Sequence, residues 1–314
     1  MSFPELPTEP KSYNILSPDY AEEFFRQFDE PTDAVPTPFP TMNREWCRDE
    51  GDGVGIGPNW IVTIGGGTGS GKSLLALNFV AEAVSQGREV GFMSLEMTHR
   101  QITSRLYAML MEEHVQRFER GAGHDKEAAR RIHATLEEWA NRISPKMFVN
   151  EDPLPSIYDM TALMEEWAEW GCELFVIDYL QLCSAPDEDG KAQQLEAIMN
   201  AVRAFAKQGR NRVIGLSQYT IQARRNAKLH KQPPSHDDYI GSSAISNNSH
   251  LCLCLDDSRY IRREQEAGGR AKTWLTNTKS RVGPPGEIPI EWDYTKLMAR
   301  EADPDEEHEW PGNQ

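Results

Sequence analysis

Residues 60–83 have the sequence WIVTIGGGTGSGKSLLALNFVAEA, in which a glycine-rich turn separates two apolar runs. The first run, 60–64, predicts a buried strand, and the second, 74–83, has the spacing of a helix. The turn between them matches the pattern G-x-x-x-x-G-K-[ST] at every fixed position, with Gly66, Gly67, Thr68, Gly69, Ser70, Gly71, Lys72 and Ser73. Glycines allow successive backbone N–H groups to face an anion at a helix N-terminus. We therefore expect residues 66–73, the phosphate turn, to bind the phosphates of a nucleotide.

Three further groups complete the expected site. Lys72 would neutralise the β- and γ-phosphates of ATP, and the hydroxyl of Ser73 would bind Mg²⁺. Asp178 ends the apolar run 175–177 and is predicted to hold the same ion through water. Glu96 follows the apolar run 90–95, where a carboxylate could activate water; a first-turn Glu favoured by the helix dipole is the alternative. ATP and Mg²⁺ are thus the predicted ligands.

Apolar strands alternate with helical patterns between residues 60 and 217. Strands that are apolar along their whole length are typical of a parallel sheet with helices on both faces, which binds ligands at its carboxyl edge. After Ser249 consecutive strands predict a β-rich extension. Further strands are expected at 90–95, 147–149, 174–177, 213–217, 251–255, 273–278 and 288–292, an exposed charged loop at 257–271, and helices at 98–142 with a break near Gly121 and Gly123, at 157–170 and at 192–208. The fold class is α/β.

The net charge of −16 is concentrated at the two ends of the chain. Residues 1–36 and 301–314 each carry a net charge of −6, which leaves −4 between them. We expect an acidic, proline-rich arm and linker over residues 1–54, an α/β domain over 55–300 and an acidic tail over 301–314. Within the arm, residues 21–28 could form a short amphipathic helix with Phe24, Phe25 and Phe28 on one side, and prolines 36, 38 and 40 indicate a linker.

Several classes of protein are disfavoured. The five cysteines include no CxxC pair and no histidine at metal spacing, which argues against a zinc site, and Cys252 and Cys254 are expected on a buried strand. No apolar run approaches the roughly 18 residues of a membrane span, and the first residues lack the pattern of a secretory signal. We expect a soluble, cytoplasmic protein.

Four stretches in order along the chain resemble one family. They are Ser94-Leu95-Glu96-Met97, Val176-Ile177-Asp178-Tyr179-Leu180-Gln181-Leu182, Leu216-Ser217-Gln218 and Lys279-Ser280-Arg281-Val282-Gly283-Pro284. With the phosphate turn they resemble the motor domain of DnaB-type replicative helicases, superfamily 4, over about residues 55–295. The resemblance implies a RecA-like P-loop core, ATP hydrolysis, single-stranded DNA as track and a homohexameric ring in a bacterial or infected host cell, with primase, a loader or other replisome proteins as candidate partners.

The resemblance also implies roles for matching residues. Glu96 is similar to the base that activates the attacking water, and Gln218 to the residue that senses the γ-phosphate. Lys279 and Arg281 resemble a basic finger that reaches the ATP site of a neighbouring subunit, where positive charge stabilises phosphoryl transfer. The alternative for this pair is a solvated turn.

Two segments are candidates for DNA binding, 183–194 and 219–245. The second carries a small-residue turn, residues 241–244, and residues 210–231 hold six bases and no acid. In a ring both segments would face the channel, where bases contact phosphates; a basic surface loop is the alternative. The predicted DNA-binding residues are Arg224, Arg225, Lys228, Lys231, Gly241, Ser242 and Ser243.

The chain departs from the family's pattern in two places. Residues 245–250 are neutral where the family carries acids, and the first 55 or so residues hold no counterpart of the family's N-terminal helical domain. Residues 20–28 could act as a linker helix. A RecA-like recombinase, another DNA-dependent motor such as a packaging ATPase, and an ATP-dependent scaffold or loader remain alternatives to a helicase.

Overall fold

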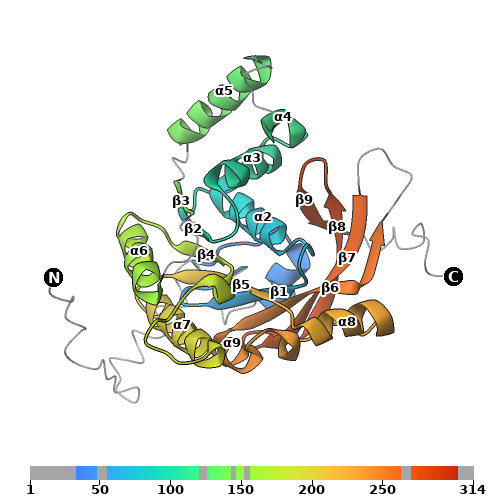
Figure 1. Ribbon diagram of the computed structural model, residues 1–314. Coiled ribbons are helices and arrows are strands. Elements are labelled where there is room, and N and C mark those ends of the chain that lie inside the picture. Colours follow the sequence, from blue (N-terminus) through green and yellow to red (C-terminus); the bar gives the residue numbers. More distant parts are fainter. Residues whose placement is uncertain are drawn as a thin grey trace, which may run out of the picture.

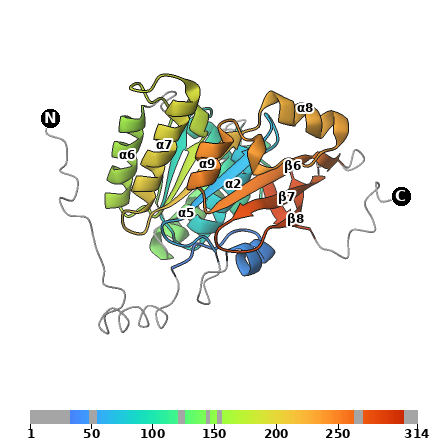
Figure 2. The same ribbon diagram turned by 90° about the horizontal axis from the view of Figure 1, so that it is seen from below.

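A computed structural model describes residues 33–47, 55–119, 126–142, 146–151, 156–262 and 270–302. Within them nine strands form one sheet in the order β3-β2-β4-β5-β1-β6-β7-β8-β9. Figures 1 and 2 show helices on both faces of this sheet. The strands are β1 (Ile61–Gly66), β2 (Val90–Ser94), β3 (Met147–Asn150), β4 (Leu174–Asp178), β5 (Arg212–Gln218), β6 (Leu251–Arg262), β7 (Arg270–Ser280), β8 (Gly286–Asp293) and β9 (Met298–Glu301).

The first six strands in this order are parallel, and β6 to β9 pair antiparallel. This confirms the predicted α/β class, the largely parallel sheet and the β-rich extension. The helices are α2 (Lys72–Ser85), α3 (His99–Leu110), α4 (Gln116–Glu119), α5 (Lys126–Arg142), α6 (Ile157–Glu169), α7 (Lys191–Ala206), α8 (Ile221–His230) and α9 (Ser242–Asn248), with shorter turns η1 (Met42–Trp46), η2 (Leu180–Leu182) and η3 (His236–Asp238).

Alternate side chains of the central strand enter two separate cores. Val62 and Ile64 pack in the core that contains α2, and Ile61 packs in the core that contains α6 and α7. All six residues of β1 are buried, as are all five of β2 and of β4. Because both faces of these strands are covered, their sequences are apolar throughout rather than alternating.

The segment expected as a linker around the prolines at 36–40 is instead packed against the domain. Val35 forms an antiparallel bridge with Ile56, and the ring of Phe39 packs edge-on against Phe79 at a centroid distance of 5.9 Å. Met42 and Trp46 are fully buried in the same core. The prolines misled the prediction because apolar side chains among and after them are buried in the core that contains α2. The candidate helix at 21–28 and the tail from 303 lie outside the described residues, and the division into three parts stays a prediction.

The long helical region predicted over 98–142 is three helices, of which α3 ends at Leu110. Glu112 adopts a left-handed conformation (φ 49°), and its carboxylate pairs with Lys296. The Val115 N–H donates a hydrogen bond to the Thr295 carbonyl, which joins the segment after α3 to the turn after β8. Tertiary contacts thus end the helix before the glycines at 121 and 123, which lie outside the described residues.

The prediction of an exposed loop at 257–271 is also wrong, at both ends of that range. Strand β6 continues to Arg262 and β7 begins at Arg270, with Ile261 paired to Lys272. The charged side chains in this stretch suggested a loop, but backbone pairing between long antiparallel strands does not require apolar residues.

The described residues bear on the expectations about the cysteines, a metal site and membrane spans. All five cysteines are free and buried, and burial raises the pKa of Cys252 to about 12, so its thiol is protonated. The described part holds no cluster of three His, Cys, Asp or Glu side chains placed to bind a metal. None of the helices in that part is long and apolar enough to cross a membrane.

Candidate nucleotide site

The phosphate turn joins the carboxyl end of β1 to the N-terminus of α2. Gly69 and Gly71 have left-handed φ angles of 77° and 95°, which disfavour any side chain. A Cβ on Gly66 would lie 2.3 Å from the Ser70 hydroxyl oxygen. Lys72 is buried, and its Nζ donates to the Gly67 carbonyl at 2.7 Å. The glycine positions are therefore fixed by the conformation of the turn.

A cavity of about 410 Å³ opens on this turn. Seven of the predicted site residues line it, and among them Lys72 with Ser73, Glu96 and Gln218 come from three separate segments of the chain. They meet because β1, β2 and β5 are parallel and end at the same edge of the sheet. The full lining is Thr68, Gly69, Gly71, Lys72, Ser73, Leu74, Glu96, Met97, Arg105, Gln218, Tyr294 and Leu297.

Asp178 ends β4 beside this cavity and is 1% exposed. Neither carboxylate oxygen accepts a hydrogen bond of ordinary geometry from the described residues. Burial raises the pKa of Asp178 to about 6, with Glu96 adding to the rise, while the Ser73 hydroxyl, Lys72 and Arg105 act in the opposite direction. A buried carboxylate without a partner is costly, and a hard cation relieves that cost. The pair Ser73 and Asp178 therefore fits Mg²⁺ in its chemistry.

Five lining residues were not among the predicted site residues, and three of them, Arg105, Tyr294 and Leu297, lie outside every predicted motif and outside the helix that follows the phosphate turn. Arg105 lies on α3, and its Nη1 contacts the Met97 sulfur at 3.4 Å. Tyr294 and Leu297 lie in the turn between β8 and β9, which the α2 residue Asn78 holds by bonds to Leu297 and Ala299. The Tyr294 ring is nearly parallel to Trp292, at a centroid distance of 6.0 Å. No motif marks these positions, because only the packing of α3 and of the β8–β9 turn brings them to the cavity.

The predicted basic finger lies at the opposite edge of the sheet from this cavity. Ser280, between Lys279 and Arg281, pairs with Leu251, which pairs with Val62 on β1. The phosphate turn begins four residues further along β1, a distance of about 13 Å at 3.3 Å per residue. Lys279 donates to the Ser246 carbonyl and the exposed Arg281 to the Asn247 carbonyl, both at the C-terminal end of α9. Neither side chain lines the nucleotide cavity of its own chain.

Gln218 is joined to the segment that precedes the small-residue turn. The Ile240 N–H donates to the Gln218 carbonyl at 2.9 Å, and the Gln181 amide donates to both Ser217 and the Ile240 carbonyl. The buried ring of Tyr239 lies against β1, since a Cβ on Gly65 would be 2.0 Å from it. Tyr239 and Ile240 are thus fixed to the ends of β1 and β5.

The segment 219–245, predicted as a DNA-binding loop, is mostly helical. It contains α8, η3 and the first turn of α9, with Gly241 as the N-cap in a left-handed conformation (φ 74°) and Ser242 and Ser243 as the first helical residues. A run of small and basic residues suggested a loop, but Thr220 caps α8 and the buried Ala223 and Ala227 pack it onto the domain.

The bases of this region do not form one surface. Arg212 is fully buried and pairs with Asp33 and Glu173, and Arg210 also pairs with Asp33. Burial opposes ionisation, but Arg212 and Arg88 hold the pKa of Asp33 below its ordinary value. The other predicted bases differ in placement: Arg224 is partly buried against Thr68, Arg225 and Lys231 are exposed, and the side chain of Lys228 lies outside the described part.

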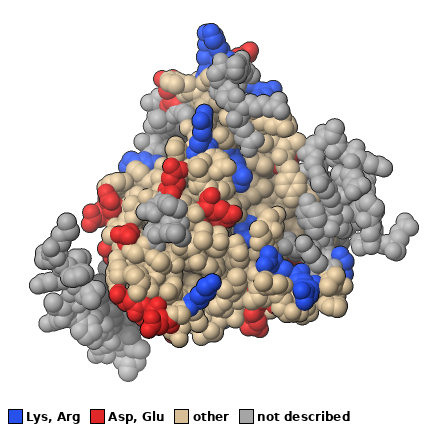
Figure 3. Space-filling model, viewed as in Figure 1, with Lys and Arg blue, Asp and Glu red and all other residues tan. Residues whose placement is uncertain are grey.

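Basic and acidic side chains gather at different places on the surface. Lys and Arg side chains gather in Figure 3 at the lower right, near the place of α8 in Figure 1. Acidic side chains gather at the lower left of the same view. The other DNA candidate, 183–194, lies before and within α7. That segment exposes Asp187, Glu188 and Asp189, which would repel a phosphate backbone.

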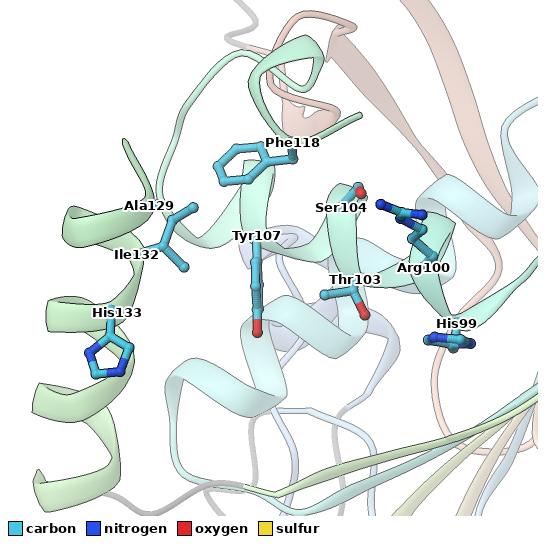
Figure 4. A pocket seen from close by; sticks show the side chains of 9 residues that line it. All are labelled: His99, Arg100, Thr103, Ser104, Tyr107, Phe118, Ala129, Ile132 and His133. Carbon is cyan, nitrogen blue, oxygen red and sulfur yellow. The ribbon is translucent and has the colours of Figure 1, made fainter. Parts of the chain in front are cut away.

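A larger cavity of about 660 Å³ lies between helix α3 and the helices α4 and α5 (Figure 4). Tyr107 on α3 faces Ile132 on α5 across it, with Phe118 at one end. Its basic lining residues are Arg100, His99 and His133, but no Asp or Glu lines it, so it lacks a carboxylate to hold Mg²⁺. Helix α3 separates the two cavities, with Arg105 lining the nucleotide cavity and Ser104 and Tyr107 lining this one.

Comparison with known proteins gives one family and one fold. Residues 52–299 match the model of the DnaB-like helicase C-terminal domain. The replicative DNA helicase DnaB of Rickettsia conorii is 26% identical over 265 residues, which are 74% of this chain and 51% of that protein. The chain therefore spans about half the length of the curated relatives it matches.

Two solved structures share the fold. A DnaB-like replicative helicase, described with its interactions with primase, superposes with a TM-score of 0.70 at 18% identity, over 94% of this chain and 68% of that one. The ATPase domain of G40P superposes with a TM-score of 0.67 at 19% identity, over 90% and 96% of the two chains.

Proposed function

We propose, because the chain belongs to the family of DnaB-like helicase C-terminal domains, that it is the ATP-hydrolysing motor of a replicative DNA helicase. In this proposal it forms a homohexameric ring that translocates on single-stranded DNA and separates the duplex ahead. The observation that carries the proposal is the nucleotide cavity, where Lys72, Ser73, Glu96 and Gln218 meet beside the unpartnered carboxylate of Asp178.

Each group in the cavity is assigned a role in phosphate chemistry. Lys72 would exchange the Gly67 carbonyl for the β- and γ-phosphates of ATP. Ser73 and Asp178 would hold Mg²⁺, which when bound neutralises charge on the phosphates. Glu96 would orient the attacking water, and Arg105 adds positive charge on the far wall. The flat ring of Tyr294 and the side chain of Leu297 suit the adenine base.

Hydrolysis is proposed to depend on assembly. At the level of Ser280, the segment that carries Lys279 and Arg281 lies about 13 Å along the strand direction from the phosphate turn of its own chain, and two strands away from β1. Arg281 is exposed, so a neighbouring copy can receive its guanidinium. A guanidinium supplied in trans stabilises the charge that develops in phosphoryl transfer. This arrangement supports a ring in which each site is completed by the next subunit.

The link between nucleotide and DNA is proposed to run through Gln218. Its side chain lines the nucleotide cavity, and its carbonyl holds Ile240, which directly precedes the small-residue turn. Tyr239 adds a second contact, against Gly65 at the end of β1. A change at the γ-phosphate would therefore reach the turn through two short paths. We propose that Arg225, Lys231 and the backbone of 241–243 contact the strand.

The proposal extends to protein partners of the assembled ring. The DnaB-like helicase of the first structural match is described with its interactions with primase. We extend that to this chain as a proposal that primase, a loader or another replisome protein binds the assembled ring.

The test is unwinding of a forked duplex by the purified protein with Mg²⁺ and ATP. We expect wild type to separate the strands and Lys72→Ala to fail. Unwinding that survives Lys72→Ala would overturn the mechanism. Strand exchange without unwinding would instead identify a recombinase, and ATP hydrolysis that DNA does not accelerate would identify a scaffold.

A further inference from the structure

Arg224, expected from the sequence to contact DNA, lies against the phosphate turn. Its Nη1 donates to the Thr68 hydroxyl at 3.2 Å. Thr68 is exposed at the tip of the turn and lines the nucleotide cavity. The direction of Arg224 is set by α8, whose cap at Thr220 and buried Ala223 and Ala227 fix the helix on the domain. The contact is therefore a consequence of how α8 packs.

One donor of the Arg224 guanidinium is buried and unused. Its Nε is enclosed and has no acceptor among the described residues. An enclosed charged donor without an acceptor costs free energy, which a new acceptor would remove. Guanidinium groups suit phosphate oxygens because their donors form a planar fork. A triphosphate on the adjacent turn would bring such oxygens close to this side chain.

The next residue on the same helix has a different environment. Arg225 is exposed, and the flanking residues on its face, Ile221 and Leu229, are 71% and 69% exposed. Successive residues on a helix point about 100° apart, so α8 directs one base to the phosphate turn and the next to solvent. Arg225 is thus a control of the same charge on the same helix.

We propose that Arg224 is a phosphate-binding residue of the nucleotide site. It ties α8 to the phosphate turn through Thr68 and contacts the terminal phosphate of a bound triphosphate. The inference rests on the proposed function, since it requires a triphosphate at this turn. Helix α8 lies in the chain between Gln218 and the small-residue turn, so Arg224 gives the DNA-facing segment a further link to the nucleotide.

The test uses the full chain and measures two affinities separately. The first is nucleotide affinity, as the Kd for a non-hydrolysable Mg²⁺–ATP analogue and the Kd for ADP. The second is DNA affinity, as the Kd for single-stranded DNA without nucleotide over a salt series. Arg224→Gln should weaken the ATP analogue roughly tenfold, as expected for one charged hydrogen bond, with little change for ADP. Arg224→Lys should restore part of the loss. The DNA affinity should stay at the wild-type value.

Arg225→Gln should show the reverse pattern, with weaker DNA binding, a salt slope smaller by about one, and wild-type affinity for the ATP analogue. If Arg224→Gln behaves like Arg225→Gln, the inference is wrong and Arg224 is a strand contact.

A second variant guards against a folding defect in Arg224→Gln. Thr68→Val removes the acceptor from the other side of the contact. Its effect on the ATP-analogue Kd should be non-additive with that of Arg224→Gln, and additive effects would contradict the link. If wild type binds no nucleotide, the proposed function falls with the inference. If wild type binds the analogue, Lys72→Ala does not, and Arg224→Gln equals wild type, the inference alone fails.

Discussion

Asp178 should destabilise the metal-free protein at neutral pH, so Asp178→Asn should stabilise it. The carboxylate is 1% exposed and has no hydrogen-bond partner of ordinary geometry, and burial raises its pKa from 3.8 to about 6. At about 1.4 kcal/mol per pKa unit, this shift corresponds to a cost of up to about 3 kcal/mol once the group is ionised.

The sign of the pH dependence follows from the raised pKa. Below about pH 3 the group is protonated in both the folded and the unfolded chain, and Asp178 has no cost. As pH rises toward 6 the unfolded chain ionises first, so the wild-type protein loses stability, and above about pH 7 the full cost is present. The gain from Asp178→Asn should therefore be small at pH 4, about 0.5 kcal/mol, and reach about 3 kcal/mol at pH 7 to 8.

The assay is urea unfolding of both proteins at pH 4 and pH 8, with chelator and no nucleotide. Asp189→Asn, at an exposed position in the loop before α7, is the matched control and should change neither value. With Mg²⁺ and an ATP analogue, wild type should gain stability that Asp178→Asn does not gain, because the ligand binds only the folded site. An Asn variant that is no more stable than wild type at pH 8 without metal would refute the reasoning.

Three further predictions follow from single contacts. Gly65→Ala places a Cβ 2.0 Å from the buried Tyr239 ring, so the free energy of unfolding should fall by roughly 1–3 kcal/mol in urea titrations, and an unchanged value would contradict the packing. Arg281→Ala should abolish DNA-stimulated hydrolysis while light scattering still shows the oligomer; mixing it with Lys72→Ala should restore part of the activity, and normal turnover of the Arg281 variant alone would disprove the contribution in trans. Glu96→Gln should bind the Mg²⁺–ATP analogue normally but hydrolyse ATP about 10²–10⁴-fold more slowly, and near-normal turnover would remove Glu96 as the base.

The sheet and the phosphate turn could be predicted because their signals are local. Strands β1, β2 and β4 are apolar runs that are buried on both faces, and the glycines of the turn are required by left-handed angles at Gly69 and Gly71. Lys72, Glu96 and Gln218 could be placed together from sequence because each follows a parallel strand, and such strands end at one edge.

The remaining features depend on contacts between distant segments. Arg105 and Tyr294 carry no motif, and they line the cavity only because α3 and the β8–β9 turn fold over it. Arg224 lies in a basic stretch that suggested DNA binding, and only the packing of α8 brings it to Thr68. The prolines before residue 41 suggested a linker, but buried Val35 and Phe39 show that composition alone did not decide the contacts of that segment.

The central claim is that the cavity at the phosphate turn hydrolyses ATP in a manner coupled to DNA. The most direct measurement is the steady-state rate of ATP hydrolysis by the purified protein, with and without single-stranded DNA, beside Lys72→Ala. We predict hydrolysis by wild type that DNA accelerates markedly, and none by Lys72→Ala in either condition. A wild-type protein that stays monomeric and neither binds nor hydrolyses nucleotide, even with DNA present, would contradict the account.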